Sequence, residues 1–248
     1  MPMTRIHIIA ETESTNDDAL KMARHGAEHG AAVLAFSQFH GRGRLGKTWY
    51  SPAGAGLYGS IVLRPRLDRT LYPRLTLLAG VAVALALEER TGLAPRLKWP
   101  NDLYLNDRKC GGILTEAVLT GTGDYVVVGI GINLVQFSAP PPEEIRGKVG
   151  TLWRSNAPEQ RPEFLFAAIH KQLLRLVREY ETRGFARIIA LWRSRDGFCG
   201  RRLAWAAPNS AKITGTSHGI DEEGDLLLVD EKHRTHKINC GDVQPAAI

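Results

Sequence analysis

A series of short apolar segments between residues 97 and 135 constrains the fold most strongly. These segments are LKW (97–99), LYL (103–105), CGGILTEAVL (110–119) and YVVVGIGINLV (125–135). The turn-forming sequences PND, NDRK and GTGD separate them. Turns this short join neighbouring strands that run in opposite directions, whereas parallel strands need a long crossover. The region therefore predicts an antiparallel β-meander.

Helices and further strands are predicted on both sides of the meander. STNDDALKMARHG (14–26) has the pattern of a helix, with Ser14 or Thr15 as its N-cap and Gly26 as its stop. Alanine and leucine dominate residues 71–91, which predicts a long helix. Apolar periodicity predicts strands over 31–39 and 57–65, and amphipathic helices over 162–183 and 185–195.

The character of the chain changes after Gly197. From there on, short β-like runs alternate with the turn sequences PNS and DEEG, which is typical of a small β-barrel of the SH3 type. We therefore predict an α+β fold in two domains. Residues 1–196 form a mixed or antiparallel sheet with helices, and residues 197–248 form the SH3-like β-barrel.

The composition limits the class of protein. Of 248 residues, 44% are hydrophobic and 23% are charged, as in ordinary globular proteins. No apolar run is long enough for a membrane span, and the N-terminus lacks a secretion signal, so we expect a cytoplasmic protein without a membrane partner. The three cysteines are too scattered for a disulfide framework and are expected to be reduced and structural. A net charge of +6 favours an anionic partner.

The segment GRGRLGKTW (41–49) is the first candidate for function. It is not a Walker loop, because the first glycine is displaced, and the TWYSPAGAG sequence that follows does not continue a helix as a dinucleotide-binding turn requires. Arg42 and Arg44 can bind phosphate or carboxylate oxygens, and Trp49 offers an apolar face. The alternative is a flexible basic surface loop.

Three other elements carry suitable chemistry. In KWPNDLYLNDRKCGGIL (98–114), a lysine fixed beside two glycines can pair with a carboxylate and a phosphate, as adenylyl transfer requires; the alternative is two hairpin turns. Glycines alternate in GIGIN (129–133), which indicates close approach of a ligand or of another backbone. The polar side chains of STN (14–16) and Gln38 can hydrogen-bond a compact polar group such as a urea.

Taken together and in this order, these elements resemble those of biotin protein ligases. The resemblance rests on STN (14–16), QxxGRGRLG (38–46), WxSPxGAGLY (49–58), KWPNDLYLNDRKCGGIL (98–114), GIGIN (129–133) and the terminal β-module. It implies the catalytic fold of these ligases, which is similar to that of class II synthetases. It also implies that biotin is activated with ATP and Mg²⁺ to biotinyl-5′-adenylate. The biotinyl group then passes to one lysine of a biotin carboxyl carrier protein, such as that of acetyl-CoA carboxylase.

The resemblance implies roles for particular residues of this sequence. Lys109 and Arg42 are the predicted catalytic residues. The predicted biotin-binding residues are Ser14, Thr15, Asn16, Gln38, Gly41, Arg42, Lys109, Gly112, Leu114, Gly129 and Gly131. The predicted ATP- or adenylate-binding residues are Arg42, Gly43, Arg44, Lys47, Trp49, Lys98, Asn101, Lys109 and Asn133. The magnesium ligands are not assigned; Asp102 and Asp107 are candidates, and the alternative is that they only shape turns.

The sequence also departs from the family pattern. Lys47 stands where the family usually has arginine, His40 replaces a small residue, and Cys240-Gly241-Asp242 replaces a GE-type ending. The first residues enter the catalytic region directly, so we expect the monofunctional form without a DNA partner; a homodimer stays open. Two alternatives remain: a ligase or transferase for lipoate or octanoate, and a nucleic-acid-binding protein that uses the basic loop.

Overall fold

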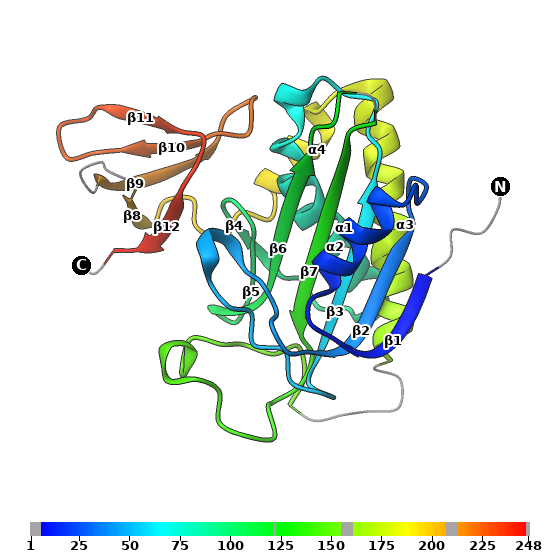
Figure 1. Ribbon diagram of the computed structural model, residues 1–248. Helices are drawn as coiled ribbons and strands as arrows, with labels where there is room; N and C mark the ends of the chain where they lie inside the picture. Colours follow the sequence, from blue (N-terminus) through cyan, green and yellow to red (C-terminus); the bar gives the residue numbers. More distant parts are fainter. Residues whose placement is uncertain (1–5, 122, 155–160, 207–212, 247–248) are drawn as a thin grey trace.

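Two β-sheets of different size form the framework of the protein (Figure 1). The computed structural model describes residues 6–121, 123–154, 161–206 and 213–246. The larger sheet has the strand order β1-β2-β3-β7-β6-β5-β4. Its strands are β1 (Ile6–Thr12), β2 (Ala32–Gln38), β3 (Gly56–Leu63), β4 (Arg96–Lys98), β5 (Asp102–Leu105), β6 (Arg108–Val118) and β7 (Tyr125–Asn133).

The predicted meander is confirmed, and the sheet is mixed as expected. Strands β4, β5, β6 and β7 pair in sequence order and antiparallel, with Gly112 opposite Gly131. Only β1 and β2 pair in parallel among the described strands of this sheet. The sequence pattern did not predict β1, because its three consecutive apolar residues do not alternate and Ile8 is half exposed at the sheet edge.

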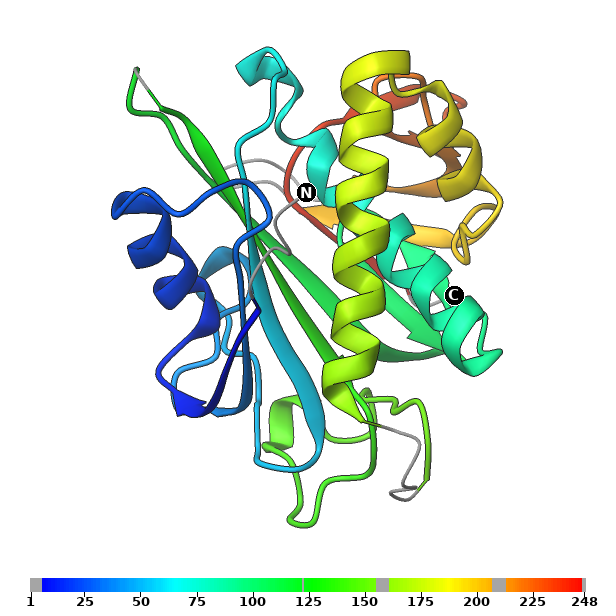
Figure 2. The same cartoon turned by 90° about the vertical axis from the view of Figure 1, so that its right-hand side faces the viewer.

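Helices cover the two faces of this sheet. They are α1 (Thr15–Arg24), α2 (Arg74–Thr91), α3 (Pro162–Arg183) and α4 (Ala186–Arg193). Figure 2 shows α1 on one face and the long helices α2 and α3 on the other. Helix α2 begins three residues later than predicted, after Pro73, because a proline ring fits the start of a helix and not its interior. Gly92 ends it in the left-handed conformation.

Alternation along the strands decides which residues face each layer. In β7, Val126 and Val128 belong to the core under α2 and α3, whereas Val127 packs in the cluster that contains residues of α1. Side chains two residues apart share a face. The face that carries Val127 therefore also carries Gly129 and Gly131. Because α1 contacts β2, β3 and β7, the β6 part of this face is left for the loop at residues 41–49.

The C-terminal unit is a five-stranded antiparallel sheet with the order β11-β10-β9-β8-β12. Its strands are β8 (Arg202–Ala206), β9 (Ile213–Ile220), β10 (Leu226–Val229), β11 (Thr235–Ile238) and β12 (Asp242–Pro245). The expected small β-unit is confirmed; β12 was not predicted. The exact division between domains at residues 196 and 197 stays a prediction. No helix among the described residues combines the length and apolar character that a membrane span requires.

The three cysteines differ in burial. All three are free, in agreement with the expectation that they are reduced. Cys110 is buried in β6, whereas Cys199 and Cys240 are exposed. Both lie in connections outside the strands, where side chains are not packed between layers.

Candidate active site

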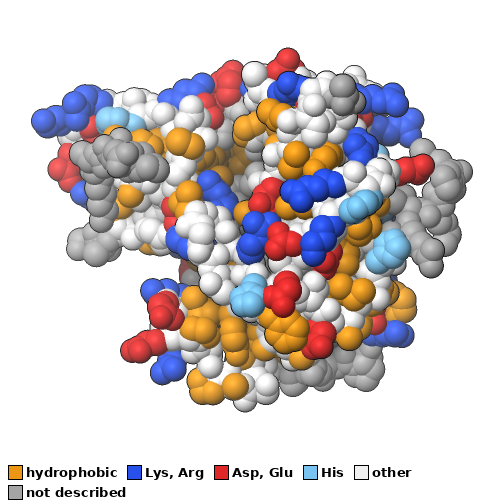
Figure 3. All heavy atoms as spheres, viewed as in Figure 1, with side chains coloured by type: hydrophobic (Ala, Val, Ile, Leu, Met, Phe, Trp, Pro, Cys, Tyr) orange, Lys and Arg blue, Asp and Glu red, His pale blue; other side chains and the backbone are white. Residues whose placement is uncertain are grey.

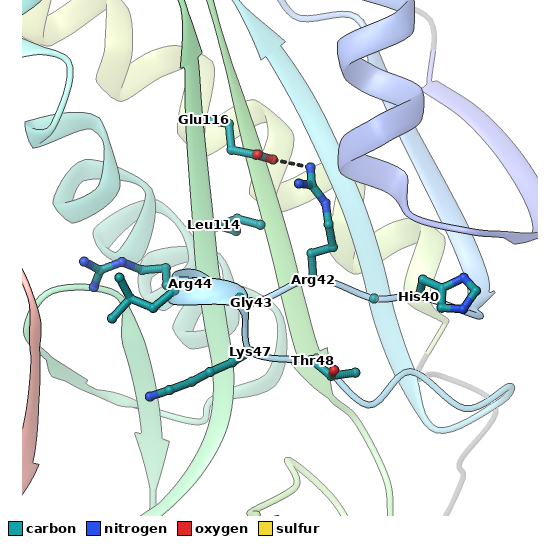
Figure 4. A pocket seen from close by; sticks show the side chains of 11 residues that line it. His40, Arg42, Gly43, Arg44, Lys47, Thr48, Leu114 and Glu116 are labelled. Carbon is teal, nitrogen blue, oxygen red and sulfur yellow. Dashed lines mark hydrogen bonds and ion pairs between the residues drawn. The ribbon is translucent and has the colours of Figure 1, made fainter. Parts of the chain in front are cut away.

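The loop at residues 41–49 covers one face of the larger sheet. A cavity of about 470 Å³ lies between residues 40–48 and the side chains of Leu114 and Glu116 (Figure 4). Other predicted residues lie next to the loop and this cavity: Asn16 contacts Glu116, Gln38 contacts Ser51, and Lys109 lies beside Trp49. Segments up to about a hundred residues apart in the chain thus meet at one site.

A chain of hydrogen bonds joins α1 to the loop. Thr15 Oγ1 and its backbone N–H both donate to Gln38 Oε1, at 3.1 and 2.9 Å. Gln38 Nε2 donates to Ser51 Oγ at 2.8 Å, and Ser51 Oγ donates to the Trp49 carbonyl oxygen at 2.9 Å. At the other end, the fully buried Ser60 Oγ lies 2.9 Å from Thr15 Oγ1. The sequence analysis predicted that Thr15 and Gln38 lie close together, which is confirmed, but it did not identify Ser51 and Ser60.

The predicted capping of α1 by a hydroxyl is wrong. Ser14 is the N-cap residue and is buried, yet its side chain makes no cap hydrogen bond. Gln38 Oε1 accepts from the first helical N–H instead, because the end of β2 delivers this long side chain to the start of the helix. A side chain on a distant strand can thus supply the hydrogen-bond acceptor for a free N–H group at the start of a helix.

Three glycines leave the sheet open opposite α1 and the loop. Gly112 and Gly131 are direct neighbours across β6 and β7, and Gly129 pairs with Leu114. A Cβ on Gly131 would lie 2.5 Å from Trp49 Nε1, and a Cβ on Gly129 would collide with Asn16 Oδ1. The glycines therefore permit close approach to the strand backbone. In this structure the approaching groups are side chains, whereas the GIGIN pattern indicated a ligand or another backbone.

Trp49 is the apolar cover of this glycine surface. Its indole lies against Gly112 and Gly131, and Lys109 Nζ is 5.5 Å from the centre of the ring. Trp49 Nε1 is buried without a hydrogen-bond acceptor in the described part of the chain. A buried donor is costly to leave unpaired, so this atom is suited to meet an acceptor on a bound molecule.

Two lysines share one buried carboxylate. Asp102 Oδ1 lies 2.5 Å from Lys109 Nζ, and Asp102 Oδ2 lies 3.3 Å from Lys98 Nζ. Lys98 is 2% exposed, whereas the Lys109 side chain is about one-third exposed and reaches the site. Two ammonium groups on one carboxylate leave a net positive charge, which attracts an anion. Sequence reasoning weighed Asp102 as a magnesium ligand or a turn-shaping residue and did not predict this pairing.

The cations of the loop have different partners. Arg42 Nη2 lies 2.9 Å from Asp17 Oδ1 and 2.6 Å from Glu116 Oε2. Figure 4 shows Arg42 directed toward Glu116, whereas Arg44 and Lys47 point to another side. Glu116 also accepts from Asn16 Nδ2 at 2.7 Å, so it links α1, β6 and the loop. Sequence reasoning did not identify Glu116, because its strand position gave no sign of this distant arginine.

The remaining predicted residues lie beside this site. Asn101 Nδ2 donates to the Ile113 carbonyl oxygen at 2.8 Å, and Asn133 Nδ2 donates to the Gly150 carbonyl oxygen at 3.1 Å. Gly41 lies close to Trp49 and Ser51, where a Cβ would not fit without movement. The predicted ligand contacts of these residues stay predictions, since their observed contacts are within the chain.

Charges are interleaved over this side of the molecule. Figure 3 shows Lys and Arg side chains alternating with Asp and Glu rather than forming one basic patch. Among the described residues, no group of three or more His, Cys, Asp or Glu side chains could hold a metal ion. Asp102 and Glu116 each contact cationic side chains. These side chains therefore do not fit a metal cage built by the protein.

The comparisons with known proteins agree with this geometry. The profile of the Biotin/lipoate A/B protein ligase family matches residues 8–133. The chain is 38% identical to a Biotin–[acetyl-CoA-carboxylase] ligase of Paracoccus denitrificans, over 89% of this chain and 92% of that one. It is 35% identical to the Bifunctional ligase/repressor BirA of Bacillus subtilis, over 93% of this chain and 71% of that one.

A solved structure matches the whole architecture. It is the biotin protein ligase of Aquifex aeolicus in complex with biotin and ATP, with a TM-score of 0.82 and 28% identity. The match covers 98% of this chain and 100% of the other. Both the catalytic sheet and the C-terminal β-unit are thus shared, and the chain belongs to the biotin protein ligases of the Biotin/lipoate A/B protein ligase family.

Proposed function

We propose that this protein activates biotin with ATP and transfers the biotinyl group to a lysine of a biotin carboxyl carrier protein. In the first step, a biotin carboxylate oxygen bonds to the α-phosphorus of ATP and pyrophosphate leaves. In the second step, the carrier amine bonds to the carbonyl carbon and AMP leaves. The observation that carries the proposal is the glycine surface under Trp49, directly beside Lys109.

We propose that biotin binds on this glycine surface. The hydrogen-bonded polar groups of Thr15 and Gln38 suit the ureido head, which needs both donors and acceptors. The fused rings need an apolar floor without side chains. Trp49 Nε1, which has no acceptor among the described residues, supplies a donor. The proposed biotin-binding residues are Ser14, Thr15, Asn16, Gln38, Gly41, Arg42, Lys109, Gly112, Leu114, Gly129 and Gly131.

Lys109 is the proposed catalytic group of adenylation. The reaction brings a carboxylate and a phosphate together, and a fixed cation offsets their repulsion as the new bond forms. Asp102 holds the Lys109 ammonium in place, and Lys98 supplies the second positive charge beside it. The nearby Cys110 is not suited as a nucleophile, because burial raises the pKa of its thiol to about 12.

Arg42 has a proposed role in holding the loop. Its contacts with Asp17 and Glu116 connect the start of the loop to α1 and β6. Its predicted catalytic contact with phosphate stays a prediction, since two carboxylates neutralise its charge. The other proposed adenylate-binding residues are Gly43, Arg44, Lys47, Trp49, Lys98, Asn101, Lys109 and Asn133.

We propose that Mg²⁺ accompanies ATP on its phosphate oxygens, because the described carboxylates of the site contact lysine or arginine. Neither of the two reaction steps is assigned to Mg²⁺. The second step needs a neutral carrier amine, so transfer is expected to rise with pH until that amine is deprotonated. The cytoplasmic location, the lack of a DNA partner and a homodimer stay predictions.

Pyrophosphate release tests the proposal. It is measured with biotin and with lipoate, each with and without a biotin carrier domain. We expect release with biotin and continuous turnover once the carrier is added. Preference for lipoate would refute the substrate and favour the lipoate alternative. Salt-dependent nucleic-acid binding without consumption of ATP would favour the third alternative.

A further inference from the structure

The C-terminal unit contacts the active-site loop through one turn. Residues 239–241 connect β11 to β12. The turn at residues 240–242, which includes the first residue of β12, contacts the second half of the loop. Arg44 Nη2 donates to the Gly241 carbonyl oxygen at 3.2 Å, and Lys47 Nζ lies 2.5 Å from Asp242 Oδ2. Figure 4 shows Arg44 and Lys47 extending away from Arg42, on the side where the red C-terminal ribbon passes.

The turn at residues 240–242 is held rigidly within its own unit. Trp205 Nε1 donates to the Cys240 carbonyl oxygen at 2.8 Å. Gly241 has a φ of 95°, and a Cβ there would lie 2.6 Å from Trp205 Nε1. Asp242 then pairs with Ala206 at the start of the β8–β12 ladder. Packing and backbone pairing on both sides therefore fix the direction of the Gly241 carbonyl and the Asp242 carboxylate.

Asp242 is charged when it meets the loop. Burial alone would raise the pKa of its carboxyl, but the hydrogen bond from Lys47 and the positive charge of Lys98 outweigh it and hold the pKa below its ordinary value. A group with a lowered pKa keeps its interaction at neutral pH and loses it only in acid. The ion pair with Lys47 thus persists at neutral pH.

Arg44 completes a bridge between the two units. Its Nη1 donates to Asn101 Oδ1 at 3.1 Å, while its Nη2 reaches Gly241. Asn101 is in turn fixed by its donation to the Ile113 carbonyl oxygen. The second half of the loop is therefore held between the start of β5 and the C-terminal unit, whereas Arg42 holds the first half.

We propose that the turn at residues 240–242 is a positioning element of the ligase. Asp242 and the Gly241 carbonyl keep Lys47 and Arg44 in place, so that the loop stays closed over the reactive adenylate until the carrier arrives. The part about adenylate rests on the function proposed above for the loop. Asp242 acts through Lys47 and is a positioning residue, not a catalytic one.

The test compares Asp242→Asn with the full-length wild-type protein. Loop closure is read by trypsin cleavage after the loop cations in the ligand-free protein. Retention of adenylate is read by the biotin label that appears on bystander albumin when biotin and ATP are present without carrier. Because the Lys47 side chain is 62% exposed, the loss of this one ion pair corresponds to about a 1.5- to 5-fold change in an equilibrium constant. We expect both readouts to rise by that factor, with a higher KM for ATP.

Two variants serve as controls. Asp242→Glu keeps the charge and should restore both readouts toward the wild-type values. Glu231→Gln breaks the pair of Glu231 with Arg202 in the same unit, at 2.5 Å and away from the loop, and should change neither readout. Each variant is first checked for an unchanged melting temperature.

Unchanged cleavage and unchanged bystander labelling in Asp242→Asn would overturn the proposal. A rise that Glu231→Gln reproduces would overturn it as well, because the effect would then be general to the C-terminal unit. Faster cleavage with unchanged bystander labelling would show that the turn at residues 240–242 holds the loop in place. It would refute the proposed role of the loop in retaining adenylate.

Discussion

Gly131→Ala is expected to weaken biotin binding without unfolding the protein. The new Cβ would lie 2.5 Å from Trp49 Cε2 and Nε1. Carbon atoms in contact are normally about 3.5–4.0 Å apart, so the indole must move by roughly 1 Å. Overpacking of this kind costs about 1–3 kcal/mol, which corresponds to about a 5- to 150-fold change in an equilibrium constant. Because Trp49 lies on a loop, its indole can move away. The added Cβ then occupies the glycine surface proposed for the biotin rings, so we expect a cost of this size in the binding of biotin.

The matched control is Gly59→Ala, in which the added Cβ would collide with the Phe166 ring. Phe166 is fully buried in α3 and cannot move out, so we expect the free energy of unfolding to fall by about 1–3 kcal/mol with an unchanged biotin KM. Biotin titration and thermal unfolding of both variants measure the two effects. A Gly131→Ala variant with a normal biotin KM and a lowered melting temperature would refute the assignment of this surface.

Three further outcomes are expected. Lys109→Met should lower the rate of pyrophosphate release by about 100- to 1000-fold while biotin still binds; near-normal release would remove Lys109 from the chemistry. At pH 8, a thiol reagent should label Cys199 and Cys240 but not Cys110, whose pKa is raised to about 12 by burial, until the protein is denatured; mass spectrometry checks this. Burial lowers the pKa of His170 below 6.5, so the unfolded state binds more protons and stability should fall as pH drops below 6.5. Urea midpoints at pH 7.5 and 5.5 should differ less in His170→Gln, and an equal difference would contradict this assignment.

The regular elements were largely predictable because their signals are local. Turn residues and apolar periodicity predicted the meander, the helix α3 and the strands of the C-terminal unit, apart from β12. The start of α2 was wrong by three residues, although Pro73 marks it in the sequence. Strand β1 was missed because pairing with β2, and not its own pattern, holds an edge strand in place.

The site was predictable as a set of motifs but not as a set of contacts. The glycines at 112, 129 and 131 indicated close approach, and the structure has Asn16 and Trp49 lying against them. Ser60 and Glu116 had no distinguishing local pattern, and Asp242 was noted only as part of a departure from the family pattern. Each gains its role from a partner far away in the chain, such as Lys47 for Asp242.

The sequence by itself determined the order of the helices and of the strands between β2 and β11, the positions without side chains and the ordered motifs that identify the family. These depend on backbone sterics and on neighbours a few residues away. Only the tertiary structure decided which charges meet: Asp102 between Lys98 and Lys109, Arg42 on Asp17 and Glu116, and Lys47 on the C-terminal unit. The physical reason is that the strength of an ion pair depends on the distance between its charged atoms and on the burial around them, which the packing of sheets and loops sets.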